Sequence, residues 1–378
     1  MHTASMRGRY VIAGIGHTGY GKLGMDTVTL NTIACSRALQ DAGVDKDRVD
    51  GLFLKTPTSS RELLYGQKVA EALGLQPRWG GAWDQGGAAN ITLINIAMMA
   101  IETGQCDIAL VSYADNPRSG SRQVYARPRG NDAPYGWFST AAGYGMIQRR
   151  HMAEYGTPPE AFAAVAMAAR KHGAGNPGAQ LRKAISYDDY LNSPWVVEPL
   201  RRDDCCLVSD GAAAVVVMSA RRAAELQVPQ PVPILGIGGA QTSYDLPLRD
   251  SLTTTEAVRA GKQAFEMAGL GPEDVDVAQI YDCFTITVLM TLEDYGFCTK
   301  GQVADFVRDG QIEFGGRLPV NTSGGLLSET GMPGMQLVLE GVRQIRGTAR
   351  LQVPHADVAL VSNQGGVMHT HSTLILGN

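Results

Sequence analysis

The sequence lacks the signals of several common protein classes. Charged residues make up only 19% of its 378 residues, and the formal net charge of −4 argues against a nucleic-acid partner. No two of the six cysteines stand in a CxxC spacing, so neither a zinc ribbon nor a disulfide framework is indicated. The N-terminus carries no long apolar run, and the longest stretch without Asp, Glu, Lys or Arg, 358–378, is interrupted by Asn, Gln, Gly and His. We therefore expect a cytoplasmic protein with reduced cysteines and no membrane span.

Several catalytic motifs are also missing. The chain contains no HExxH and no G-x-S-x-G. Its G-x-G-x-x-G, at 14–19, lacks the acidic residue that a dinucleotide site places about 20 positions further on, where Leu39 stands instead. We interpret these glycines as a tightly packed turn. His369 and His371 share one strand face without a third ligand, so we expect no metal site and no covalently bound cofactor.

What the chain does contain is an internal repeat. Three segments recur in the same order, namely IAGIG at 12–16 and ILGIG at 234–238, ALQDAGVDKDRVD at 38–50 and AFEMAGLGPEDVD at 264–276, and DIALVS at 107–112 and DVALVS at 357–362. The separation is far too long for a solenoid repeat. It predicts two similar halves, 1–228 and 229–378.

Each half alternates strands with helices. In the first half we expect strands at 10–13, 51–55, 108–112 and 213–218, and helices at 30–42 and 90–103. In the second half we expect strands at 233–237, 277–281, 358–362 and 372–376, and helices at 255–268 and 335–345. This alternation predicts an α/β fold of two βαβαβ units with mostly parallel strands and helices on both faces. Residues 113–209 are an insertion in the first half, which we expect to form a cap or loop domain.

Glycine clusters stand at the junctions between these elements. DQGGAAN at 84–90 opens the second helix of the first half, NTSGG at 321–325 precedes its counterpart, and NQGG at 363–366 follows a buried strand. Open α/β sheets bind ligands at such points, and backbone N–H groups there can stabilise an oxyanion. Each cluster alone is equally consistent with ordinary turn chemistry.

Together with the duplicated halves, these clusters resemble the thiolase superfamily over nearly the whole chain. The segment 87–90 is similar to the family's Cys-Ala-Ser-Gly, SDGAAA at 209–214 to its SDGAAA strand, 321–325 to its NxxGG, and 363–366 to its Cys-x-Gly-Gly. The resemblance implies a thiolase-like fold with five α/β/α/β/α layers, and a homodimer.

The catalytic groups of a thiolase are missing, however. Gly87 stands in place of the nucleophilic cysteine, and Asn363 in place of the acid/base cysteine. Gly331-Met332-Pro333 replaces Gly-His-Pro, and YDCF at 281–284 replaces Asn-Glu-Ala-Phe. Thiolysis through an acyl-cysteine is therefore chemically unavailable.

A non-thiolytic, sterol-carrier-like branch of the superfamily fits better. YDCFT at 281–285 and LEDYGFC at 292–298 resemble that branch, whose bacterial members act as retro-aldolases on steroid side-chain acyl-CoA thioesters. The resemblance implies retro-aldol or aldol chemistry on a 3-hydroxyacyl-CoA. It also implies a small partner protein with an OB fold and a zinc ribbon. The branch usually supplies a second tyrosine and a histidine after NxxGG, where this chain has Gly331 and Pro333.

The resemblance also indicates candidate site residues. We expect Tyr281 to relay the hydroxyl proton and His369 to replace the missing acid. Backbone N–H groups at Gly87 and Gly366 are expected to form the oxyanion hole. The expected substrate-binding residues are Asn90, Asp282, Ser323, Gly324, Gly325, Asn363 and His371, of which Asp282 could instead cap the next helix. Two alternatives stay open: a non-catalytic acyl-CoA carrier or scaffold, and an acyltransferase that does not use an acyl-cysteine.

Overall fold

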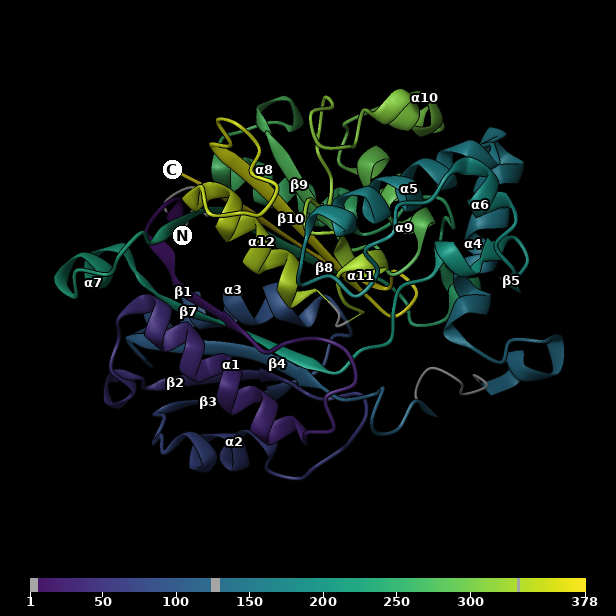
Figure 1. The fold of residues 1–378 in the computed structure, drawn as a ribbon. Helices are drawn as coiled ribbons and strands as arrows, with labels where there is room; N and C mark the ends of the chain where they lie inside the picture. The colour runs from purple at the N-terminus through teal and green to yellow at the C-terminus, as the bar shows by residue number, and fades with distance from the viewer. Residues whose placement is uncertain (1–5, 124–129, 332–333) are drawn as a thin grey trace.

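The computed structural model describes residues 6–123, 130–331 and 334–378, in which strands and helices alternate in two rounds (Figure 1). The first round comprises β1 (Tyr10–His17), α1 (Thr27–Ala42), β2 (Gly51–Lys55), α2 (Tyr65–Leu73), β3 (Trp79–Trp83), α3 (Ala89–Glu102), β4 (Ile108–Asp115) and β7 (Gly211–Ser219), followed by α7 (Ala220–Glu225). The second comprises β8 (Val232–Gln241), α8 (Ala257–Ala268), β9 (Val277–Ile280), α9 (Thr285–Asp294), α10 (Val303–Val307), α11 (Gly325–Ser328), α12 (Met335–Arg346), β10 (Val358–Gly365) and β11 (Thr370–Gly377).

The strand order repeats between the two rounds. In the described residues the main sheet has nine strands in the order β3-β2-β4-β7-β1-β8-β11-β10-β9, so β2-β4-β7-β1 recurs as β9-β10-β11-β8. β7 and β11 run antiparallel to their neighbours, while the other strands of each half share one direction. The halves meet where β1 pairs antiparallel with β8. This order confirms the two βαβαβ halves that the repeat predicts.

Helices form layers around and between the strands. α3 and α12 contact each other and strands of both halves, while α1 and α2 pack on strands of the first half and α8 packs on β8 and β11. Figure 1 shows α3 and α12 between the two sets of strands, with α1 and α2 on the far side of the first set. The layers therefore follow the expected α/β/α/β/α order.

Close helix–strand packing explains the repeated Gly-Ile-Gly segments. A Cβ atom on Gly14 or Gly16 would lie 2.3 Å from a backbone carbonyl oxygen of α1. A Cβ on Gly236 or Gly238 would lie 2.1 Å from a carbonyl oxygen of α8. Only glycine lets the helix approach the strand this closely. The repeated motif is thus a packing feature in both halves, as the sequence indicates.

The insertion between β4 and β7 is mostly helical. It contains α4 (Thr140–Tyr155), α5 (Pro159–Gly175), α6 (Tyr187–Leu191) and a hairpin of β5 (Trp195–Val197) and β6 (Leu200–Arg201). Although it belongs to the first round of the chain, α5 packs on α9, α10 and α11 of the second (Figure 1). Its position brings side chains of 113–209 toward the β9–α9 junction. Within the described ranges no helix combines the length and apolar character needed to cross a membrane.

Candidate active site

Two of the glycine clusters meet at the start of α3. A Cβ atom on Gly86 would lie 2.7 Å from the Cα of Gly365, and one on Gly87 would lie 2.3 Å from the carbonyl oxygen of Gln364. The backbones of 85–87 and 364–366 are therefore in direct contact. Glycine is required on both sides because any side chain would separate the two segments.

The Tyr281 ring fills the space beside Gly87. Tyr281 follows β9, and its backbone N–H donates to the carbonyl of Ser362 in β10 (3.0 Å). A Cβ on Gly87 would lie 2.5 Å from both Cε2 and Cζ of the ring, which is 7% exposed. The structure thus brings together two of the predicted residues. The ring occupies the place that a nucleophilic side chain at position 87 would need.

His369 lies against Gly366. A Cβ on Gly366, whose φ is +69°, would lie 2.3 Å from Cδ2 of the imidazole. Arg249 Nη2 lies 2.7 Å from Nδ1 of His369, and the carbonyl oxygen of Ser243 lies 3.0 Å from the same atom. The ring also stacks on Tyr244, with the centroids 5.4 Å apart. His369 is therefore buried and held in place next to the second glycine cluster.

Two buried amides flank the same junction. Asn90 Nδ2 donates to the carbonyl of Gly87 (3.2 Å), and Asn363 Nδ2 lies 3.5 Å from the carbonyl oxygen of Gly334. A Cβ on Gly334 would lie 2.3 Å from Asn363 Oδ1 and 2.7 Å from Asn90 Nδ2. Both predicted amides thus lie beside one glycine at the start of α12. The adjoining Met332 and Pro333, which stand where thiolases have His-Pro, lie outside the described residues.

Asp282 serves a different helix from the one its position in the sequence suggests. Its fully buried carboxylate accepts hydrogen bonds from the backbone N–H groups of Leu326 (2.7 Å) and Leu327 (3.2 Å), at the start of α11. It therefore caps α11 and not α9, the helix that follows it in the chain. Burial raises the pKa of Asp282 to about 7.

Ser323, Gly324 and Gly325 form a second, separate junction with Asp282. A Cβ on Gly325 would lie 2.3 Å from Oδ2 of Asp282, and one on Gly324 would lie 2.9 Å from the Cα of Gly173 in α5. Ser323 Oγ donates to Glu329 Oε2 (2.7 Å), and burial raises the pKa of Glu329 to about 7. The interior of this junction is filled by the protein's own polar groups. Substrate binding by these residues stays a prediction.

His371 points away from the glycine clusters. In the β10–β11 ladder Ser372 pairs with Asn363 and His371 pairs with Gln364, so His371 lies on the opposite face of the sheet from Asn363. Its Nε2 lies 2.9 Å from both the Tyr295 hydroxyl and Ser362 Oγ. Burial lowers its pKa to about 3. The structure therefore places His371 against α9 and not beside Gly87.

Sequence reasoning missed Tyr144, which lies next to Gly366. The Tyr144 hydroxyl donates to the carbonyl of Gly366 (2.7 Å) and accepts from Gln364 Nε2 (2.8 Å). Gln364 Nε2 also lies 2.9 Å from Cys283 Sγ. The only local signal is an aromatic residue between two glycines at 143–145. The residues that its hydroxyl contacts are about 220 positions away in the chain, so no local pattern identifies them.

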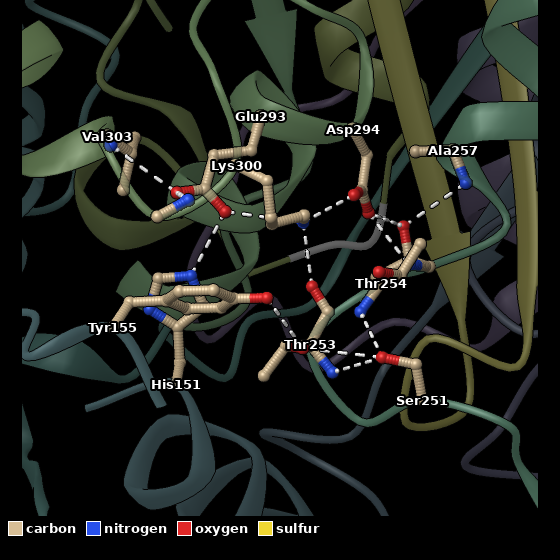
Figure 2. Close-up of polar contacts among 12 residues, drawn as sticks. His151, Tyr155, Ser251, Thr253, Thr254, Ala257, Glu293, Asp294, Lys300 and Val303 are labelled. Carbon is tan, nitrogen blue, oxygen red and sulfur yellow. Dashed lines mark hydrogen bonds and ion pairs between the residues drawn. The ribbon is translucent and has the colours of Figure 1, made fainter. Parts of the chain in front are cut away.

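A partly buried charge cluster fastens α4 to the end of α9 (Figure 2). His151 Nε2 lies 3.0 Å from Glu293 Oε2, and Lys300 Nζ lies 3.2 Å from the same oxygen and 2.5 Å from Asp294 Oδ1. Burial alone would raise the pKa of Glu293, but His151 and Lys300 outweigh it and hold that pKa below its usual value. The cluster fixes the helix that carries Tyr144. In the described part of the chain, no group of three or more His, Cys, Asp or Glu residues could hold a metal ion.

Comparison with known proteins identifies the family. The thiolase C-terminal domain-like family matches residues 238–378. A 17-hydroxy-3-oxo-4-pregnene-20-carboxyl-CoA lyase of Mycobacterium tuberculosis is 39% identical, over 98% of this chain and 100% of the relative. A steroid side-chain-cleaving aldolase of Thermomonospora curvata is 38% identical, over 98% of each chain. The solved Ltp2-ChsH2(DUF35) aldolase superimposes with a TM-score of 0.89 at 37% identity, over 98% of both chains. The chain therefore belongs to the thiolase superfamily, in the branch that contains the steroid side-chain-cleaving aldolases.

Proposed function

We propose that this protein is a lyase that cleaves the C2–C3 bond of a steroid 3-hydroxyacyl-CoA by a retro-aldol reaction. The observation that carries the proposal is the contact between the Tyr281 ring and Gly87, at the point where thiolysis would need a nucleophile. The names of the lyase and the aldolase that resemble this chain over its whole length support the same chemistry. The coenzyme A thioester is the substrate, and the reaction involves only proton transfers and the cleavage of one carbon–carbon bond.

In the proposed reaction, a base takes the proton of the 3-hydroxyl and C3 becomes a carbonyl. The electron pair of the C2–C3 bond passes to the thioester, which leaves as an enolate. A proton added at C2 then gives the shorter acyl-CoA. Tyr281 is our candidate for the proton relay at the hydroxyl, because its ring lies directly over the Gly87 backbone. His369, held against Gly366, is our candidate for protonating C2.

The enolate oxygen needs hydrogen-bond donors that are fixed before the reaction begins. We assign this role to backbone N–H groups at Gly87 and Gly366, where two backbone segments meet at the N-terminus of α3. The positive end of the helix dipole adds to their effect on a developing negative charge. Asn90 donates a hydrogen bond to the carbonyl of Gly87, and Asn90 and Asn363 both lie against Gly334. These contacts hold the two segments in place.

The proposal is tested by direct turnover. The chain is incubated with 17-hydroxy-3-oxo-4-pregnene-20-carboxyl-CoA, and the products are separated by liquid chromatography and mass spectrometry. We expect a ketone and a shorter acyl-CoA in equal amounts, and no cleavage of the same thioester without its 17-hydroxyl. Tight binding without turnover would favour a carrier or scaffold. Transfer of the intact acyl group would favour an acyltransferase, and either result would contradict the lyase.

We also propose that the enzyme works as a homodimer with a small partner that has an OB fold and a zinc ribbon. The solved relative named Ltp2-ChsH2(DUF35) aldolase supports a partner protein, and the position of β3 at the end of the sheet supports pairing with a second copy. Light scattering of the chain, alone and co-expressed with such a partner, tests both points. The six cysteines are free thiols, which fits our proposal of a cytoplasmic enzyme.

A further inference from the structure

We propose that Tyr144 is a positioning residue that holds together the two segments of the proposed site, the glycine turn at 365–366 and the segment 281–284. This inference rests on the proposed function, because it assigns Tyr144 a role in that reaction. Tyr144 comes from α4, within the insertion at 113–209, whereas both segments belong to the second half of the chain. The insertion thus supplies a side chain that the β-strands alone do not.

The hydroxyl of Tyr144 holds the glycine turn. It has one hydrogen, and the carbonyl of Gly366 at 2.7 Å is a closer acceptor than Gln364 Oε1 at 3.0 Å. Gln364 Oε1 is in turn engaged by the backbone N–H of Met368 (3.1 Å), while Gln364 Nε2 donates to the Tyr144 hydroxyl. A glycine at position 366 can adopt many backbone conformations. The hydrogen bond to its carbonyl therefore fixes the direction of the peptide groups on either side.

The ring of Tyr144 contacts the segment that carries Tyr281. It stacks on Phe284, with the centroids 4.3 Å apart and the planes at 28°. Gln364, which holds the hydroxyl, also donates to the Sγ of Cys283. A single side chain is therefore linked to residues two and three positions after Tyr281 and to the turn that contains Gly366.

The surroundings of Tyr144 fix it firmly enough for this role. The side chain is 1% exposed, and the charge cluster around His151 and Glu293 fastens the later part of α4 to α9 (Figure 2). On the other side of the turn, Arg249 Nη2 donates to the carbonyl of Val367. The turn is thus held from two sides, and Tyr144 is the support that also reaches the Tyr281 segment.

Tyr144→Phe tests the inference, because it keeps the stacked ring and removes only the hydroxyl. We expect kcat to fall roughly 10- to 100-fold, as small displacements of reacting groups do, with KM for the acyl-CoA changed less than about threefold. Tyr65→Phe is the matched control. Its buried hydroxyl accepts from Asn31 Nδ2 (2.7 Å), and the two residues belong to α2 and α1, which pack on strands of the first half. The control should lose a similar amount of thermal stability and keep its kcat.

Hydrogen exchange separates this inference from the proposed function. Amides of 364–369 should exchange faster in Tyr144→Phe than in the wild type, and not in Tyr65→Phe, whether or not the protein turns over a steroid thioester. Gln364→Met should lower kcat similarly, and the double variant should be no worse than the worse single variant. Should Tyr144→Phe fail to fold, Gln364→Met carries the same comparison. Unchanged exchange at 364–369, or an unchanged kcat, would overturn the inference.

Discussion

Tyr281 and Asp282 lie at two different junctions where glycines lead into a helix, the start of α3 and the start of α11, and the two junctions are filled in opposite ways. In the second half the carboxylate of Asp282 accepts the N–H groups of Leu326 and Leu327 at the start of α11. At the start of α3 the N-cap residue is Ala88, whose side chain cannot cap the helix, and the Tyr281 ring lies beside Gly87.

The difference is consistent with the single reactive site that we propose beside Gly87. A helix N-terminus presents unpaired backbone N–H groups, and at the start of α11 the protein's own Asp282 carboxyl accepts from them. At the start of α3, we propose that a substrate oxyanion accepts from the backbone N–H groups instead. Tyr281 and Asp282 are adjacent in the chain, so a single dipeptide serves both junctions, with its tyrosine at the first and its carboxylate at the second.

The strongest test of this comparison is Tyr281→Phe. The ring still packs on Gly87, but no hydroxyl remains to move the substrate proton. We expect kcat to fall about 10²–10⁴-fold, as is usual for the loss of a general acid or base, with little change in the dissociation constant of the thioester without its hydroxyl. Steady-state kinetics and calorimetric titration measure the two quantities. Near-normal cleavage by this variant would remove Tyr281 from the mechanism.

Gly87→Ala should have a smaller but substantial effect. The added Cβ would lie 2.5 Å from the Tyr281 ring and 2.3 Å from the carbonyl oxygen of Gln364, so the ring or the backbone must move. We expect kcat to fall roughly 10- to 100-fold and unfolding to be easier by about 1–3 kcal/mol. Gly19→Ala is the control, because its Cβ would meet nothing within 4 Å. Equal activity of the two variants would show that the space beside Gly87 is not critical.

The parts of this fold that the sequence predicts are those set by local patterns. The Gly-Ile-Gly repeats and the strand at 51–55 appear where expected. The helix expected at 30–42 begins three residues earlier and ends before Gly43 as expected, and the strand expected at 108–112 continues to Asp115. β3 was missed because its sequence, WGGAW, has two glycines with φ near 150° and little strand character of its own. It forms a strand because β2 is beside it.

The contacts that define the site depend on the tertiary fold and could not be read locally. Asp282 caps a helix 44 residues further on, although a cap for the next helix was the simpler expectation. Tyr144 reaches Gln364 across 220 residues. The junctions at the glycine clusters, in contrast, could be recognised from the sequence, because two backbone segments approach closely only at glycine, whichever segment lies opposite.

Asp282→Asn sharpens the second half of the comparison. Burial raises the folded-state pKa of Asp282 from 3.8 to about 7, so the folded protein keeps a proton that the unfolded chain releases. The stability that this proton confers is complete below about pH 4 and is lost as the pH rises to about 7. The free energy of unfolding of the variant should therefore fall less steeply over this range than that of the wild type.

Urea unfolding at a series of pH values measures that slope. Only the difference between the variant and the wild type is read, because other buried acids titrate as well. Asp276→Asn controls for the loss of a paired acceptor, since Asp276 Oδ2 also accepts two consecutive backbone N–H groups, those of Asp357 and Val358. Parallel curves for Asp282→Asn and the wild type would mean that the second junction does not hold a protonated carboxyl.

The smallest expected effect concerns incubation with acetyl-CoA, which should leave the mass of the protein unchanged. Gly87 offers no nucleophile at the first junction, and burial raises the pKa of the neighbouring Cys283 thiol well above its usual value, so almost no thiolate is present near neutral pH. Burial raises the pKa of the Cys206 thiol to about 12 in the same way. Intact mass spectrometry should therefore show no acyl adduct. Alkylation of all six cysteines in urea confirms that an adduct would be detected. A stoichiometric acetyl group on any cysteine would show that the protein forms a covalent acyl-enzyme. That result would contradict the difference that we draw between the two junctions.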